Sequence, residues 1–450
     1  MFDSKEFTFT ELTPGSSYTL TVFAMKGDRQ VELLKQTYKT GVVGESEDDP
    51  IIISTKEEFL KMADDGTKYY KLADHIDFGG ASMSALFTST STVTTEKKAF
   101  SGQFDGAGFT IKNIDIKDEV DVNKSEVSIF GIVTTGTIKN VVFDNIKIDN
   151  TVKTRNSSSY IAIVASRTTA TTATLSQITI KNSHIKYTQG NSSQTVYIGS
   201  LVGNLQGTAS EITIEDSSIT VDAVVIKEPN TSNSAGTFIG GAIGRIDDSK
   251  AMTIEKISAD VDITFTLDQS ERKSEKLGRV YIGGVIGIHN GFVAVTGKFT
   301  EQLIAKGSVK VNYNVHPEST NLTRFRVGGI AGSANARFKE IYATNEIVFD
   351  ANRIQNGHKI ASLVAETSSS SLLALAHNQV IITYDNNETT DTIQTSLYNN
   401  IWSTVLSDIK KVVGSAVTVN EVAQTLENET ISSTDIKTYF TSDWIKTKLS

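Results

Sequence analysis

The stretch FIGGAIG at residues 238–244 decides the fold, because it recurs along the chain with the same alternation of residue types. This seven-residue unit is called the glycine phrase below. An apolar residue alternates with a small one, which predicts strands packed so closely that neighbouring backbones exclude larger side chains. Close copies are YIGSLVG at 197–203, YIGGVIG at 281–287 and RVGGIAG at 326–332; weaker ones are YIAIVAS at 160–166, KIASLVA at 359–365 and SIFGIV at 128–133.

A second unit follows each glycine phrase and splits into two short alternating runs around a polar bend. Examples are TIKNVVFDNIKI (137–148), QITIKNSHIKY (177–187), EITIEDSSITV (211–221), TIEKISADVDITF (253–265) and EIYATNEIVF (340–349). The alternation predicts that Ile214, Ile219, Val261, Ile263 and Phe265 face inward, whereas Asp260, Asp262 and Thr264 face water. Each repeat thus supplies three short strands, two tight bends and one long polar connection.

A repeat of roughly 40 residues with three strands predicts an all-β fold, a right-handed parallel β-helix of about seven or eight coils. A β-propeller has blades of similar length, but each blade needs four antiparallel strands and three hairpins. Two-residue hairpin signals are scarce inside these repeats, which favours the β-helix.

The flanking segments divide the chain into further parts. Residues 1–42 are expected to be the C-terminal part of a β-sandwich domain, and the acidic stretch ESEDDP within 43–50 a linker. The β-helix is assigned to 51–400, where Thr55 and Glu58 predict a capping box and a short helix that covers the first coil. Residues 401–450 are assigned to a C-terminal cap, with a docked helix over 401–424 and Trp444 in a core.

The composition argues against several classes of function. The net charge is −9, which argues against a nucleic-acid partner, and the chain has no cysteine for disulfides, zinc-thiolate sites or thiol nucleophiles. No apolar run reaches the roughly 18–20 residues that span a bilayer, and no signal peptide is visible at the N-terminus. The absence of cysteine and a Lys-, Asn- and Ile-rich composition favour the exterior of a bacterium, so an exported chain would be a piece of a longer one.

Three stretches resemble the GLUG-type β-helix of bacterial surface proteins, a module also found in the non-catalytic N-terminal part of IgA-specific zinc metallopeptidases. They are STKEEFLKMADDGTKYYKLADHIDF (54–78), FSGQFDGAGFTIKNIDI (100–116) and IFGIVTTGTIKNVVF (129–143). In addition, Leu12–Tyr18 (LTPGSSY) resembles the tyrosine corner of fibronectin type III domains, in which the tyrosine hydroxyl bonds upstream backbone. The resemblance implies a surface-exposed scaffold or binding role.

No catalytic, cofactor-binding or metal-binding residue is predicted in this chain. None of the six histidines is followed by Glu, and no two lie at the spacing of an H-E-x-x-H zinc site. His75, between Asp74 and Asp77, is better explained as part of a polar turn, and so is Asp105. Asp260 and Asp262 lack acidic counterparts on neighbouring coils. The acidic run Asp118, Glu119, Asp121, Asn123, Glu126 lacks the central glycine of a calcium loop.

The long connections carry the functional hypothesis, because length variation is concentrated just before each glycine phrase. Stacking would align them on one edge, where repeat proteins commonly bind partners, although long loops are also tolerated without function. The sequence therefore favours an extracellular adhesion or binding scaffold for a protein or glycan on a host or neighbouring cell. The alternatives are an accessory substrate-presenting region of a secreted hydrolase and an ice-binding surface, for which the threonine tracts 88–95 and 168–174 are poorly placed. The connections are 117–127, 149–159, 188–196, 227–237, 267–280, 315–325 and 384–396.

Overall fold

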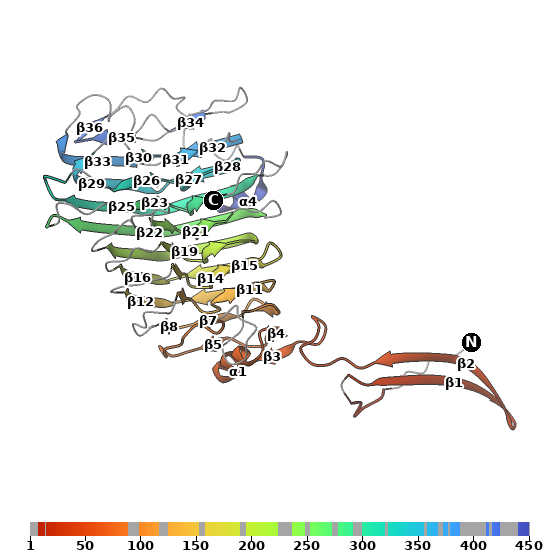
Figure 1. Ribbon diagram of the computed structural model, residues 1–450. Helices are drawn as coiled ribbons and strands as arrows, with labels where there is room; N and C mark the ends of the chain where they lie inside the picture. Colours follow the sequence, from red (N-terminus) through yellow and green to blue (C-terminus); the bar gives the residue numbers. More distant parts are fainter. Residues whose placement is uncertain are drawn as a thin grey trace.

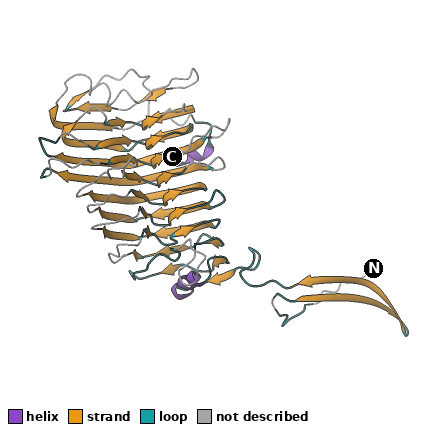
Figure 2. Ribbon diagram, in the orientation of Figure 1, coloured by secondary structure: helices purple, strands orange, loops and turns teal. Residues whose placement is uncertain are grey.

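The protein forms a rod of stacked β-strand coils with a separate hairpin at its N-terminal end (Figures 1 and 2). The structure is a computed structural model. It describes residues 8–13, 15–88, 99–116, 125–152, 158–189, 195–223, 236–247, 253–271, 278–290, 299–319, 323–354, 358–367, 372–376, 379–387, 411–413, 416–423 and 440–449. Among these residues no helix is both long enough and apolar enough to cross a membrane.

Two seven-stranded parallel sheets contain the glycine phrases. The first sheet stacks β9 (Glu126–Val127), β13 (Ser159–Ile161), β17 (Val196–Gly199), β20 (Gly236–Gly240), β23 (Arg279–Gly283), β26 (Arg324–Gly328) and β30 (Lys359–Ala361). The second sheet stacks β10 (Ile132–Val133), β14 (Ala165–Thr168), β18 (Val202–Leu205), β21 (Ile243–Ile246), β24 (Ile286–His289), β27 (Ala331–Ala334) and β31 (Val364–Thr367).

The third sheet, called the long sheet, holds the second unit of each repeat. Its first column contains β3 (Ile51–Ile53), β4 (Tyr69–Leu72), β5 (Ile76–Asp77), β6 (Gln103–Asp105), β7 (Thr110–Lys112), β11 (Thr137–Asp144), β15 (Thr174–Lys181), β28 (Phe338–Ala343), β32 (Leu372–Ala376) and β34 (Lys411–Val413). Its second column contains β8 (Asp115–Ile116), β12 (Lys147–Val152), β16 (His184–Gln189), β29 (Glu346–Ile354), β33 (Gln379–Asn387), β35 (Ala416–Val419) and β36 (Val422–Ala423). Three uninterrupted strands, β19 (Thr208–Ala223), β22 (Ile254–Gln269) and β25 (Thr300–Val315), cross both columns.

The predicted parallel β-helix is confirmed by this topology, with about seven coils. Like phrases pair with like in register: Ile198 with Ile239, Ile239 with Ile282, and Ile282 with Val327. One detail of the prediction is wrong, because the glycine phrase is not a single strand. It folds at its central small residues into two strands on different sheets, and the second unit forms the long sheet.

Close backbone contact across this fold explains why the phrase contains glycine. A Cβ on Gly203 would lie 3.0 Å from the Tyr197 carbonyl oxygen, and a Cβ on Gly244 would lie 2.6 Å from the Ile198 nitrogen. Both distances are shorter than ordinary van der Waals contact. The two seven-stranded sheets therefore approach backbone to backbone, and only glycine fits at these positions.

The interior is a continuous apolar core along the rod, as the alternation predicted. Ile214, Ile219, Val261, Ile263 and Phe265 are all buried in it. Side chains on alternate positions of these strands face outward, and Asp262 is exposed. Burial of aliphatic rungs from every coil supplies the main stabilising contribution of the fold.

A short helix covers the first coil, as predicted. Helix α1 (Lys56–Lys61) begins with the expected capping box, in which Thr55 and Glu58 exchange side-chain and backbone hydrogen bonds. A single 3₁₀ turn, Met62–Asp64, continues it. Phe59 is completely buried and contacts Phe104 edge to face, with ring centroids 5.8 Å apart. The helix thus seals the end of the apolar core.

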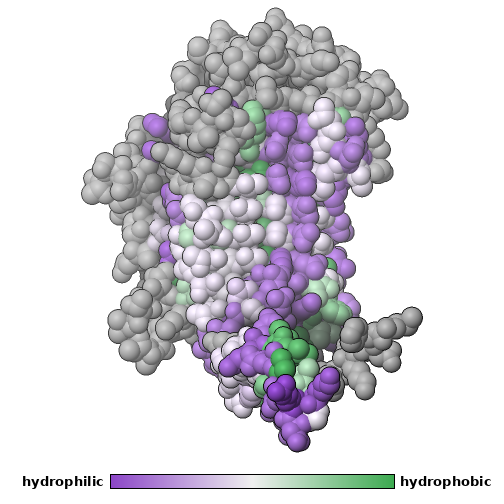
Figure 3. Space-filling model, turned by 90° about the vertical axis from the view of Figure 1, so that its right-hand side faces the viewer, coloured by the Kyte–Doolittle hydropathy of each residue, from purple (hydrophilic) through white to green (hydrophobic). Residues whose placement is uncertain are grey.

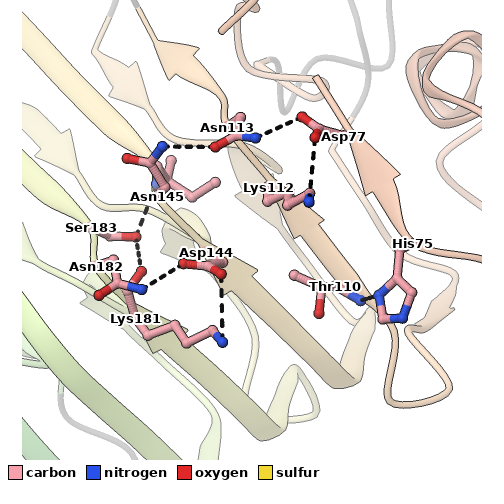
Figure 4. A network of polar contacts seen from close by, with 11 residues as sticks. His75, Asp77, Thr110, Lys112, Asn113, Asp144, Asn145, Lys181, Asn182 and Ser183 are labelled. Carbon is pink, nitrogen blue, oxygen red and sulfur yellow. Dashed lines mark hydrogen bonds and ion pairs between the residues drawn. The ribbon is translucent and has the colours of Figure 1, made fainter. Parts of the chain in front are cut away.

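Asparagines line one corner of the long sheet, where the backbone adopts positive φ (Figure 4). Asn113, Asn145 and Asn182 have φ values of 59°, 53° and 51°, a region in which Asn is better tolerated than most residues. The Asn145 amide donates to Asn113 Oδ1 at 2.7 Å, and the Asn113 amide donates to Asp77 Oδ1 at 2.7 Å. The same corner residues therefore turn the chain and link successive coils.

The N-terminal hairpin consists of β1 (Ser17–Lys26) and β2 (Arg29–Lys39), paired antiparallel. The backbone N–H of Thr13 donates to the Tyr18 hydroxyl at 2.8 Å, which is the contact expected from the tyrosine-corner resemblance. Large apolar side chains remain exposed here, among them Phe9, Met25 and Leu33. Figure 3 shows hydrophobic surface at the base of the molecule.

The C-terminal region differs from the prediction. In the described part of 401–424, residues 411–413, 416–419 and 422–423 are strands β34, β35 and β36, so a helix there is wrong; residues 401–410 lie outside the described residues. The short helix α4 (Asp443–Lys448) docks on the side of the rod, where Phe440 and Ile445 pack on Ile304 and Tyr342. Trp444 is partly buried beside this cluster.

Candidate binding surface

The polar residues considered in the sequence as candidate site residues lie in separate local environments in the structure. His75 precedes β5, and its Nδ1 accepts a hydrogen bond from the Thr110 N–H at 3.0 Å (Figure 4). Asp105 accepts a hydrogen bond from the Ala107 N–H at 2.8 Å, as expected for a turn residue. Within the described residues, no three His, Cys, Asp or Glu side chains come together in a way that could hold a metal ion.

The acidic candidates also have individual environments. Asp262 Oδ1 accepts a hydrogen bond from the Ser308 hydroxyl at 2.7 Å. Burial raises the pKa of Asp260, and the neighbouring Lys306 opposes that rise. Of the run considered for calcium, Asp118, Glu119, Asp121 and Asn123 lie outside the described residues. Glu126 forms an ion pair with Arg167 at 3.1 Å.

An aromatic column runs along the outer side of the first seven-stranded sheet. The stacked rings of Tyr160 and Tyr197 have centroids 5.3 Å apart, and those of Tyr197 and Phe238 are 5.4 Å apart. Tyr281 continues the column. The Arg245 guanidinium lies over the Tyr197 ring and donates to its hydroxyl at 2.9 Å. Because these rings contact one another and an arginine, the aromatic column links successive coils.

This column was not predicted from the sequence, although the sequence contains a pattern that indicates it. The first residue of the glycine phrase is aromatic at 160, 197, 238 and 281. In a parallel stack, equivalent phrase positions lie one above another at about 4.8 Å, which is the spacing needed for ring stacking.

The described ends of the long connections lie on one edge of the long sheet. Ala223 at the end of β19 pairs with Leu267, and Gln269 at the end of β22 pairs with Val315. Most of the interior of these connections lies outside the described residues. A second set of connections also varies in length and was missed; it includes Ile246 to Ile254 and His289 to Thr300.

Two adjoining cavities hollow the surface at this edge. The first, called the Gln269 pocket, has a volume of about 400 Å³ and is lined by Asp222, Ala223, Thr266, Asp268, Gln269, Ser270 and Glu271. The second, called the Asn312 pocket, has a volume of about 390 Å³ and is lined by Thr266, Leu267, Asp268, Asn312, Tyr313, Asn314, Asp350, Ala351 and Asn352. They share Thr266 and Asp268, so together they form one groove across several coils.

Strand register explains the polar lining of this groove. Asp222 pairs with Thr266, Thr266 with Asn312, and Asn312 with Asp350, which places these outward-facing side chains in one column. Asp268 and Asn314 are paired two positions further along. The spacing between neighbouring coils is about 4.8 Å, so hydrogen-bonding groups repeat along the groove at that interval.

Some groove residues are held by hydrogen bonds, and others have no protein partner. Asp268 Oδ1 accepts hydrogen bonds from the Ser270 backbone at 3.0 Å and the Ser270 hydroxyl at 2.8 Å. Asn352 donates to the Val315 carbonyl at 2.7 Å and accepts from the Val315 N–H at 2.9 Å. Within the described part of the chain, no hydrogen bond is formed by the side chains of Asp222, Asn312 or Asn314. These three side chains can therefore bond a ligand in the groove.

The described part of the chain is thus a parallel β-helix that carries a polar groove on its surface. No protein-family model matches the chain, and no curated protein matches it either. Among solved structures, it is similar to a crystal structure described as a "putative immunoglobulin A1 protease" from Bacteroides ovatus. The two share 14% identity over 88% of each chain, with a TM-score of 0.38.

Proposed function

We propose that this chain is a non-catalytic binding scaffold of the bacterial cell surface or secreted space, which holds a protein or glycan of a host or neighbouring cell. The groove formed by the Gln269 and Asn312 pockets is the observation that supports this proposal. Its lining offers hydrogen-bonding side chains that the described residues leave without partners.

The chemistry of the groove favours binding over catalysis. General acid–base chemistry needs a proton donor and acceptor set at matched distances around a reacting bond. Two acids of the groove instead hold neighbouring groups: Asp268 accepts from the Ser270 hydroxyl, and Asp350 accepts from the Thr383 hydroxyl. The groove consists of repeated amide, hydroxyl and carboxylate groups on a rigid sheet, which is a pattern suited to recognition.

The rod also suits multivalent attachment. A parallel stack presents equivalent positions at a constant interval, so a long ligand can contact several coils at once. Contacts that are weak individually then combine, because each one raises the effective concentration of the next.

Blocking the groove tests this proposal. Thr266 lines both pockets, and replacing it in T266W fills the place where they meet. Beads coated with the T266W protein should attach to target cells at least tenfold less than wild-type beads. The matched control is T264W, two residues earlier on β22, because Thr264 faces outward on the same strand but lines neither pocket. Equal attachment by T266W and wild type would refute a role for the groove.

A further inference from the structure

The last described residues, 440–449, lie on one outward-facing column of the long sheet and are called the tail segment below. Phe440 packs edge to face on Tyr342, with ring centroids 5.9 Å apart, and the buried Ile445 belongs to the same apolar cluster. Helix α4 contacts both β22 and β25. The column beneath the tail segment contains one residue from each of four successive coils: Thr213, Ser258, Ile304 and Tyr342.

Polar contacts hold the two ends of the tail segment on different coils. Before α4, the Glu340 carboxylate on β28 accepts a hydrogen bond from the Thr441 N–H. At the end of α4, the Lys306 ammonium on β25 donates to the Lys448 carbonyl at 3.3 Å. The Lys448 ammonium donates to the Thr213 hydroxyl on β19 at 3.0 Å. The tail segment thus runs along the stack and joins four coils, a span of roughly 14 Å at about 4.8 Å per coil.

Apolar burial adds to these hydrogen bonds. Ile304 and Tyr342 lie in a cluster separate from the core of the rod, and they are 0% and 4% exposed with the tail segment in place. If the tail segment left, both side chains would face water, and so would Phe440 and Ile445. Exposing apolar surface in water is unfavourable, which favours the docked state.

The contact between Glu340 and Thr441 closes a loop of chain that contains the last coils. The two residues are 101 positions apart, and every described strand from β29 to β36 lies between them in the sequence. In a stack of repeats, each coil is held by its neighbours, so opening starts most easily at an end. A coil inside a closed loop has fewer open conformations than one beside a free chain end. Docking of the tail segment therefore opposes opening of the whole loop.

We propose that the tail segment is a clasp, which keeps the last coils of the rod from peeling away from its C-terminal end. The clasp makes these coils open together with the release of α4 instead of one after another. This inference goes beyond the proposed binding function and does not depend on it. The protection given to the last coils cannot exceed the free energy with which the tail segment docks.

Hydrogen exchange of the full chain, measured by mass spectrometry, tests the clasp. The readout is β33, because it lies in the second column of the long sheet, whereas the tail segment docks on the first. I445D removes an apolar anchor of the tail segment and changes no residue of the rod. Exchange in β33 should be about tenfold faster in I445D than in the wild type, since burial of one aliphatic side chain is lost.

Two further variants complete the test. E340A removes the contact from the side of the rod and should accelerate exchange in β33 in the same way. K446A is the matched control on the same helix, because the ion pair of Lys446 with Asp443 lies at the surface. Exchange in K446A should equal that of the wild type.

The exchange of α4 itself shows whether the tail segment has been released. Faster exchange in α4 of I445D with unchanged exchange in β33 would overturn the clasp, because docking would then have only a local effect. Unchanged exchange in both elements would overturn it as well, since Ile445 would not hold the tail segment. The same acceleration in K446A as in I445D would show that the apolar anchor is not responsible, and would also contradict the proposal.

Discussion

Glu340 Oε1 accepts a hydrogen bond from the Thr441 backbone N–H at 2.6 Å, although the two residues are 101 positions apart. The same oxygen accepts bonds from the Thr441 hydroxyl and from the Ser442 N–H. The pKa of Glu340 is lowered overall, because these bonds outweigh the opposing effect of burial. One carboxylate on the side of the rod thus fixes the chain just before α4.

Replacing this carboxylate should release the C-terminal segment. E340A is expected to lower the free energy of unfolding of the docked segment by about 1.5–3 kcal/mol, since hydrogen bonds to a charged group are lost. Limited proteolysis should then cleave near residue 440 faster than in the wild type. E301A is the control, because the Glu301 ion pair with Lys339 lies at the surface and contributes little. Equal cleavage of E340A and wild type would contradict the anchoring role.

Adding one methyl group to the glycine phrase should destabilise the stack. In G244A the new Cβ would lie 2.6 Å from both the Gly203 oxygen and the Ile198 nitrogen, and neither backbone atom can move freely. We expect a loss of about 1–3 kcal/mol, as for overpacked cores, measured by urea denaturation. G27N is the comparison: no atom lies within 4 Å of a Cβ there, and Asn tolerates its φ of +59°. If G244A had the same free energy of unfolding as the wild type, the two sheets would have to lie further apart than these distances indicate.

Two buried histidines should make stability depend on pH. Burial lowers the pKa of His358 to about 3, and burial lowers that of His289 to about 4. The unfolded chain takes up these protons near pH 6.5 and the folded chain does not, so the free energy of unfolding falls as pH drops below 6.5. Each histidine contributes a slope of about 1.4 kcal/mol per pH unit below that value.

Urea denaturation between pH 6 and pH 5 measures this slope while most carboxylates stay ionised. H358L should reduce the slope by about half, because only His289 then remains of the pair. An identical slope in H358L and wild type would mean that His358 is protonated in the folded protein.

Asn145 contributes to stability in two ways that can be measured separately: through its hydrogen bond and through its tolerance of a positive φ. N145A loses the hydrogen bond to Asn113 and also places alanine at a φ of 53°, so a loss of about 2–3 kcal/mol is expected. N145G loses the same bond but has no penalty at that φ, and its loss should be about 1 kcal/mol smaller. Thermal denaturation of both variants checks the difference. Equal stabilities of N145A and N145G would show that backbone strain has no part in this corner.

The sequence by itself determined the coil architecture, because a repeated phrase must occupy equivalent positions in a stack. The inward orientation of Ile263 and Phe265 followed from alternation alone, and so did the capping helix at Thr55. Both are local properties: strand alternation has a period of two, and a capping box spans four residues.

Only the tertiary structure decided where the groove lies and how the chain ends. The two pockets are lined by residues of neighbouring strands, and alternation in one strand carries no information about the register of the next. The helix expected over 401–424 was wrong where it is described, because helix-like spacing over a short apolar run does not exclude strands. The contact of Glu340 with Thr441 likewise depends on which coil the tail reaches, and that is set by packing on Ile304 and Tyr342.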